Sequence, residues 1–160
     1  MENASKALII AGAILISIVL ISVGIMIVNG GNSAVDSAIA SMSQHDKDIY
    51  NNAFINYEGR KSGTQVKALL SQINTNNMQN YEIEGKVITI NFVNITFPTG
   101  ATAPTSPITY TTYGNLDDMD AMSTNITALR SAINTGATYT VTFDYDAKTG
   151  LITSTTITKV

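Results

Sequence analysis

Residues 7–28 (ALIIAGAILISIVLISVGIMIV) form an uninterrupted run without a single charged side chain, and only six residues precede them. At about 1.5 Å per residue, a helix of this length spans roughly 33 Å, which matches a hydrocarbon core of about 30 Å. Bulky Ile, Leu and Val side chains are distributed around every face of such a helix, so every face needs apolar neighbours. The run therefore predicts either a membrane-spanning helix or a rod that packs against copies of itself.

The same run does not have the form of a cleaved signal peptide. It is longer than the 7–15 apolar residues typical of such peptides, and the small-x-small motif at residues 38–40 lies well beyond its end. Lys6 precedes the run, whereas Asp36, Asp46 and Asp48 follow it. The positive-inside tendency then predicts a cytoplasmic N-terminus, with the rest of the chain outside the cell.

Composition excludes several classes of protein. The chain has no cysteine and one histidine, which rules out disulfides, thiolate metal sites, iron–sulfur clusters and His-rich metal sites. Nine Lys and Arg residues against 12 Asp and Glu residues give a net charge of −3. Nucleic-acid binding is not expected, because it needs clustered positive charge. No cofactor is expected.

The segment after the apolar run predicts a continuation of the rod. Residues 29–32 (NGGN) are typical of a break, so Gly30 and Gly31 are candidate hinge residues. Apolar residues then recur at three- and four-residue steps to residue 57, which predicts an amphipathic helix. His45 is expected on the solvent-facing side of that helix.

The remaining residues, 58–160, predict a small globular head. Residues 58–63 (EGRKSG) suggest a turn, and Ser62 with Gln65 has the spacing of a capping box before a helix that we expect to end at Asn76 and Asn77. The further elements expected are a strand at 86–97, an exposed loop at 98–107, a short strand at 108–113, a helix at 116–133, and a hairpin of 138–145 with 151–159. In the hairpin, Thr153, Thr155 and Thr156 are expected on a solvated face.

The predicted fold class is thus α+β, with a long N-terminal hydrophobic helix followed by a small antiparallel β-rich head with short helices. Three parts are expected. They are a hydrophobic helix at 1–28, a hinge and amphipathic helix at 29–57, and a globular head at 58–160.

No motif in the head indicates catalysis. Asp117, Asp118 and Asp120 fit a charged first helical turn better than a calcium site, and Asp144 with Asp146 fits turn chemistry. The single histidine makes a Ser/His/Asp triad improbable, and no phosphate-cradling glycine loop occurs. Asn94 and Asn125 each begin an Asn-x-Thr sequence, which makes them candidate glycosylation sites.

Small residues in the apolar run are candidates for close helix packing: Ala7, Ala11, Ala13, Ser17 and Gly24. Such residues are also common in any membrane span. Glu2 is either an ordinary polar residue beside a membrane span or a carboxylate that pairs with a buried amine of a neighbouring chain. A charge pair is the way to bring either group into a dry core.

The layout of a hydrophobic N-terminal helix, a continuing helix and a small β-rich head resembles a type IV pilin or a related filament subunit. Glu2 is similar in kind to the acidic residue near the family's mature N-terminus, although the family usually has it fifth. The resemblance implies a divergent member without a recognisable leader peptide. It also implies a fibre core of bundled N-terminal helices with the heads outside.

The expected function is therefore that of a non-enzymatic structural subunit of an extracellular pilus-like filament. Its expected partners are copies of itself, the cytoplasmic membrane before assembly, and pilus-type assembly machinery. The alternative is a single-pass membrane-anchored surface protein whose head binds a ligand or a partner.

Overall fold

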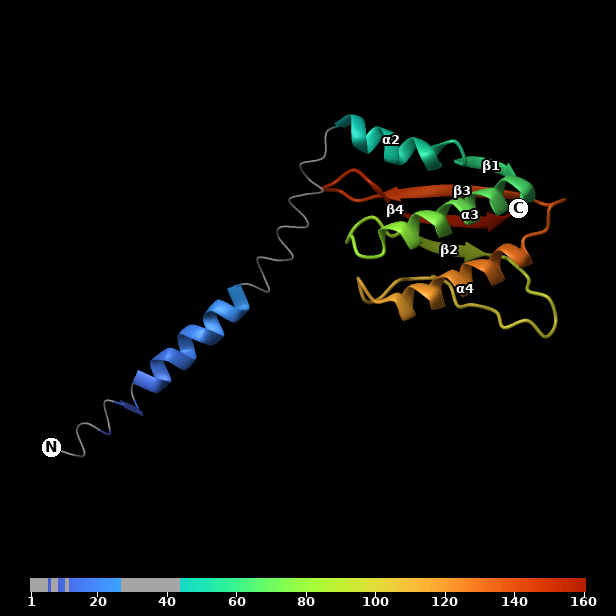
Figure 1. Cartoon of the computed structure of the whole chain (residues 1–160). Helices are drawn as coiled ribbons and strands as arrows, with labels where there is room; N and C mark the ends of the chain where they lie inside the picture. The colour runs from blue at the N-terminus through green and yellow to red at the C-terminus, as the bar shows by residue number, and fades with distance from the viewer. Residues whose placement is uncertain (1–5, 7–8, 11, 27–43) are drawn as a thin grey trace. The chain divides into compact units, whose positions relative to one another are not determined.

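A computed structural model describes residues 6, 9–10, 12–26 and 44–160 of the chain (Figure 1). The chain divides into two compact units, Met1–Ala38 and Ile39–Val160. In the first unit, residues 12–26 form a continuous helix. The second unit contains one sheet and the helices that pack on it.

The sheet has four strands in the order β1-β3-β4-β2. Their bounds are β1 Gly59–Ser62, β2 Thr89–Val93, β3 Thr138–Tyr145 and β4 Ile152–Lys159. β3 pairs antiparallel with both β1 and β4, whereas β2 pairs parallel with β4. The register places Thr140 opposite Thr158 and Ile90 beside Thr155.

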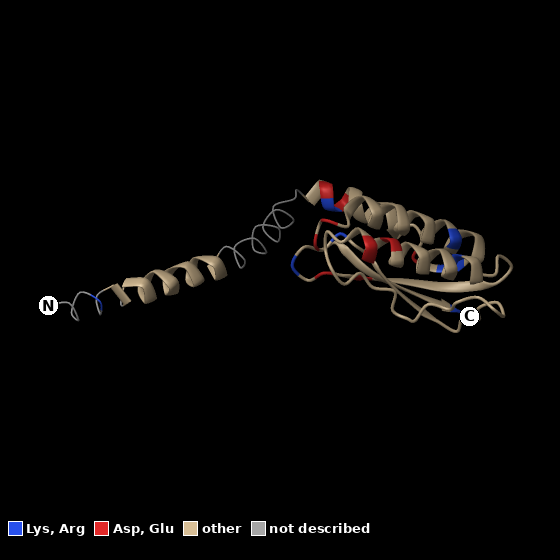
Figure 2. Ribbon diagram, turned by 60° about the horizontal axis from the view of Figure 1, so that its bottom comes forward, with Lys and Arg blue, Asp and Glu red and all other residues tan. Residues whose placement is uncertain are grey.

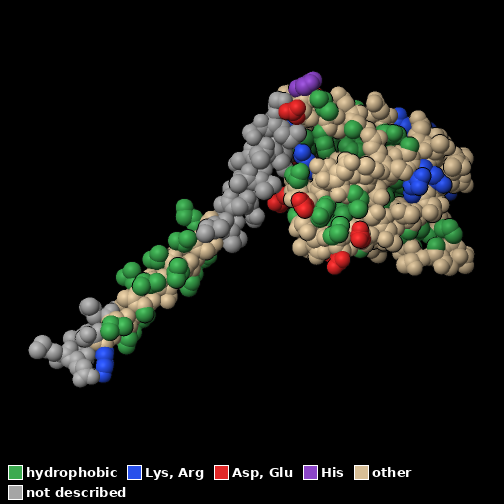
Figure 3. Space-filling view, in the orientation of Figure 1, with side chains coloured by type: hydrophobic (Ala, Val, Ile, Leu, Met, Phe, Trp, Pro, Cys, Tyr) green, Lys and Arg blue, Asp and Glu red, His purple; other side chains and the backbone are tan. Residues whose placement is uncertain are grey.

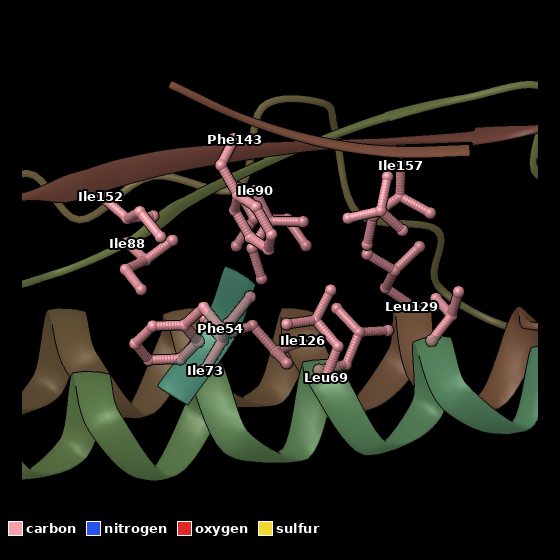
Figure 4. Close-up of a cluster of buried hydrophobic side chains, with 14 of the residues drawn as sticks. Phe54, Leu69, Ile73, Ile88, Ile90, Ile126, Leu129, Phe143, Ile152 and Ile157 are labelled. Atoms are coloured by element: carbon pink, nitrogen blue, oxygen red, sulfur yellow. The ribbon is translucent and has the colours of Figure 1, made fainter. Parts of the chain in front are cut away.

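Helices α3 (Gly63–Asn80) and α4 (Leu116–Ala132) lie together on one face of this sheet (Figure 2). Helix α2 (Gln44–Ile55) precedes β1. The core lies between the sheet and the helices, where apolar side chains from both layers meet (Figure 4). It includes Phe54 from α2, Leu69 and Ile73 from α3, and Ile126 and Leu129 from α4.

Local sequence explains where the two longest helices of this unit begin. The Ser62 hydroxyl accepts a hydrogen bond from the Gln65 main-chain N–H, and the Gln65 side chain accepts one from the Ser62 N–H. This is the predicted capping box, and it is confirmed. Asn115 caps α4 by accepting from the N–H groups of Asp117 and Asp118. The predicted helix at 116–133 and the predicted hairpin are also confirmed.

Several predictions for the head need correction. The sheet is mixed and not antiparallel, because β2 joins β4 in parallel. Residues 59–62, expected as part of a turn, form edge strand β1. Of the strand expected at 86–97, only the part at β2 forms. The strand expected at 108–113 is reduced to one bridge between Ile108 and Ile90.

Two further corrections concern buried polar residues. Helix α3 does not end at Asn76 and Asn77 but continues to Asn80, with Asn77 fully buried. Thr155, expected on a solvated face, is also fully buried. Its hydroxyl donates to the Thr142 carbonyl at 3.1 Å, which removes the cost of burying it.

The prediction of a long N-terminal hydrophobic helix, and with it a transmembrane helix, is wrong for the described residues. None of the helices in that part of the chain is both long and apolar enough to cross a bilayer. The continuous helix at 12–26 rises roughly 22 Å, against about 30 Å of hydrocarbon. The expected length included residues 7–8, 11 and 27–28, which lie outside the described residues.

Candidate functional site

The helix at 12–26 exposes apolar side chains on all of its faces. We call this the apolar helix surface. Figure 3 shows its visible face covered with apolar side chains, and Figure 2 shows no charged residue along it. Leu15, Leu20 and Met26 are 65%, 66% and 76% exposed. A helix that is apolar all round is normally surrounded by apolar matter, whether other helices or lipid.

The two serines of this helix do not oppose burial. The Ser17 hydroxyl donates to the Ala13 carbonyl at 2.8 Å, and the Ser22 hydroxyl donates to the Ile18 carbonyl at 2.8 Å. Both hydroxyl protons are therefore satisfied inside the helix itself. The apolar helix surface can enter a dry environment without leaving an orphaned donor.

Small residues leave room for close approach along the same helix. A Cβ added at Gly12 or Gly24 would meet nothing within 4 Å. Ala13 and Ser17, predicted to lie at a helix contact, are exposed. The other predicted assembly and hinge residues, namely Glu2, Ala7, Ala11, Gly30 and Gly31, lie outside the described residues.

In the second unit, a groove of about 680 Å³ runs between α2 and α3. Its lining is uncharged and combines apolar and amide or hydroxyl side chains. Ile49 and Ala53 come from α2, and Gln72, Asn76 and Gln79 come from α3. Ile49 is 58% exposed, which makes it the most exposed large apolar residue of the groove.

Polar side chains attach α2 to the rest of this unit. The Asn51 amide donates to the Gly150 carbonyl at 2.8 Å and accepts from the Ile152 N–H at 3.0 Å. On the same helix, the Tyr50 hydroxyl donates to the Lys86 carbonyl at 3.0 Å. The Gln72 amide donates to the Ala53 carbonyl at 2.9 Å. These bonds hold one wall of the groove in place.

Tyr50 lines this groove and is partly buried, with its ring edge-on to Phe54 at 5.6 Å between centroids. Burial raises the pKa of Tyr50 to about 12, against a smaller lowering effect of its hydrogen bond with Asn76. The phenol is therefore neutral at any physiological pH and serves as a hydrogen-bond donor. Its hydrogen bond to the Lys86 carbonyl ties α2 to the segment that leads into β2.

The acidic residues that could suggest a metal site have structural roles. No group of three or more His, Asp or Glu side chains that could hold a metal ion occurs among the described residues. Asp117 and Asp118 lie in the first turn of α4, as predicted. Asp146 accepts from the N–H of Thr149 at 2.7 Å and from that of Lys148 at 3.0 Å, as expected for turn chemistry. His45 is exposed on α2, as predicted.

The two candidate glycosylation residues are both exposed but lie in different structures. Asn94 follows β2 directly and has a positive φ of 59°. Asn125 lies inside α4. Sequence reasoning did not identify the structural roles of Asn51 and Asn77, because an asparagine within a helical pattern carries no signal for a distant main-chain partner.

Comparisons with known proteins found no match for this chain. No family model matches the chain, and neither a curated protein nor a solved structure matches it. The resemblance to type IV pilins therefore gains no support from family or homologue.

Proposed function

We propose that this protein is a structural subunit that assembles with copies of itself into an extracellular helical filament, through residues 12–26. The observation that carries the proposal is the apolar helix surface. Twelve large apolar side chains between residues 9 and 26 are each 46% to 76% exposed. Copies of the same helix offer a partner of matching chemistry on every face.

Energetics favours such packing. Fully burying an Ile, Leu, Val or Met side chain contributes roughly 1.5–3 kcal/mol, so completing the burial of a half-exposed one contributes about half of that. Twelve such side chains together contribute roughly 9–18 kcal/mol, which is enough to offset most of the roughly 4–15 kcal/mol that association costs in lost freedom. No covalent bond between subunits is needed, which suits a chain without cysteine.

The details of the helix support close contact between copies. Gly12 and Gly24 leave open space beside the main chain, and small residues let helix backbones approach each other. Ser17 and Ser22 are already bonded to carbonyls of their own helix. The contact would therefore enclose neither charge nor unpaired hydroxyl from the described part of this helix.

The assembly test compares three full-length variants with the unmodified chain. Ile16→Lys and Leu20→Lys each place a charge on the apolar helix surface, where burial without a partner is costly. Val160→Lys is the matched control, because Val160 is 67% exposed and Leu20 is 66% exposed. We expect filaments of the unmodified chain and of V160K in negative-stain microscopy, and only small species of I16K and L20K in sedimentation.

Two outcomes would contradict the proposal. The first is that I16K and L20K form filaments as well as V160K does. The second is that the unmodified chain remains monomeric and associates only with lipid vesicles, which would favour the membrane-anchored alternative. Labelling of intact cells with antibodies against residues 44–160 tests the extracellular location separately.

A further inference from the structure

The two Asn-x-Thr sequences differ in ways that bear on modification. Asn94-Ile95-Thr96 follows the last residue of β2, outside any helix or strand. Asn125-Ile126-Thr127 lies within α4, whose bounds are Leu116–Ala132. An enzyme that attaches a sugar must draw the asparagine and the two residues after it into its own active site. A segment outside regular structure can be drawn in without first breaking a helix.

Asn94 also has a backbone conformation that asparagine adopts more readily than most residues do. Its φ of 59° lies in the left-handed region, where asparagine is enriched among non-glycine residues. Asn94 and Thr96 are both exposed. Among the described residues, neither the Asn94 amide nor the Thr96 hydroxyl has a hydrogen-bond partner. The two groups that define the acceptor sequence are therefore exposed, while Ile95 between them is partly buried and packs against the edge of the core.

The second sequence is held by its helix. Ile126, its middle residue, is only 1% exposed and belongs to the core. The Thr127 hydroxyl donates to the Ser123 carbonyl at 2.9 Å. Presenting Asn125 to an enzyme would require a turn of α4 to open, with removal of Ile126 from the core.

We propose that Asn94 is an acceptor for N-linked glycan and that Asn125, in the folded protein, is not. The donor class is an oligosaccharide linked to a polyprenyl phosphate or diphosphate. The Asn94 amide nitrogen forms a bond to the anomeric carbon of the first sugar and loses a proton to a base of the transferase. The bond between that carbon and the phosphate oxygen breaks, and its electron pair leaves with the lipid phosphate. No atom is oxidised or reduced.

In a cell, this modification rests on the extracellular part of the proposed function, because such transfer occurs on chains that leave the cytoplasm. The acceptor geometry can be tested without that assumption. The folded full-length chain is incubated with a purified oligosaccharyltransferase and a lipid-linked oligosaccharide. Intact mass and glycopeptide mapping then report occupancy at each asparagine.

We expect occupancy at Asn94 to exceed that at Asn125 by at least about tenfold, because modification of Asn125 requires local opening of α4. Thr96→Val, which removes the hydroxyl while keeping the shape, should abolish modification of Asn94. The matched Thr127→Val should leave modification of Asn94 unchanged. Synthetic peptides spanning residues 90–98 and 121–129 measure acceptance of the two sequences without the fold. If both peptides are accepted equally well, the preference for Asn94 in the folded chain comes from the fold and not from the local sequence.

Equal occupancy of the two asparagines in the folded chain would overturn the proposal. So would preference for Asn125, or no modification of a folded chain whose 90–98 peptide is accepted. Filament formation plays no part in this assay, so failure of the assembly proposal is read from the lysine variants and failure of the acceptor proposal from the glycopeptides.

Discussion

The side-chain amide of Asn77 forms two hydrogen bonds with the main chain of Ile88. Its Nδ2 donates to the Ile88 carbonyl, and its Oδ1 accepts from the Ile88 N–H, both at 2.9 Å. Asn77 and Ile88 are each fully buried. One helix side chain thus supplies both partners that a neighbouring strand would supply, and it anchors the segment entering β2 to α3.

Removing this amide should be costly. In Asn77→Ala, the buried N–H and carbonyl of Ile88 lose their partners and a small cavity remains, so we expect unfolding to become easier by about 2–4 kcal/mol. Urea denaturation followed by circular dichroism measures the change. Asn80→Ala is the control, because the Asn80 amide bonds to Asn76 in the preceding turn. Equal losses in the two variants would contradict this role of Asn77.

Gly63 occupies a position that admits no side chain. Its N–H donates to the Ala137 carbonyl at 3.0 Å, and an added Cβ would overlap the Asn134 carbonyl group. Gly63→Ala should therefore reduce the free energy of unfolding by roughly 1–3 kcal/mol, as overpacking usually does. At Gly136 the nearest atom to an added Cβ lies at 3.5 Å, an ordinary contact. Thermal melting should show a clearly smaller shift for Gly136→Ala than for Gly63→Ala.

Tyr50 should make stability depend on alkaline pH. Because its folded pKa is about 12 and its ordinary value is 10, the folded state favours the neutral phenol. This contribution is fully present below pH 10 and is lost as the pH rises from about 10 to about 12. It amounts to roughly 2–3 kcal/mol. Urea unfolding at several alkaline pH values should show the stability advantage over Tyr50→Phe shrinking across that window. Parallel curves for the two proteins would contradict the assignment.

Asp146 should have the opposite pH dependence. The hydrogen bond from the Thr149 main chain, followed by that from the Thr149 hydroxyl, holds the pKa of Asp146 below its ordinary value. The ionised carboxylate therefore contributes stability above about pH 4, and this contribution is lost as the pH falls through the folded pKa. Asp146→Asn should be less stable than the unmodified chain at pH 7. That difference should disappear in acid, and unfolding curves between pH 3 and pH 7 would show it.

Features set by nearby residues were predictable from the sequence. The capping box of Ser62 and Gln65 depends on two residues three positions apart, and it forms as expected. Likewise, the apolar stripe that includes Leu69 and Ile73 forms the buried side of α3. The β3–β4 hairpin follows from alternating β-branched residues around the turn at Asp146.

Features set by distant residues were not predictable. The parallel pairing of β2 with β4 joins segments that lie far apart in the chain, and nothing local distinguishes it from antiparallel pairing. Asn77 was expected at a helix end because asparagine is a poor helix former. Its distant partner, Ile88, keeps it inside α3. Thr155 was expected in solvent, but the register of β4 turns it toward the core, where the Thr142 carbonyl accepts its hydrogen bond.

The order of residues alone determined that this chain has an uncharged apolar run before a polar α+β head, because hydropathy and local periodicity are properties of neighbouring residues. Only the tertiary structure decided how strands β1 to β4 are ordered, which asparagines bond to distant main-chain groups, and which Asn-x-Thr sequence lies outside regular structure. Those outcomes depend on which distant groups satisfy each other's hydrogen bonds once the core excludes water.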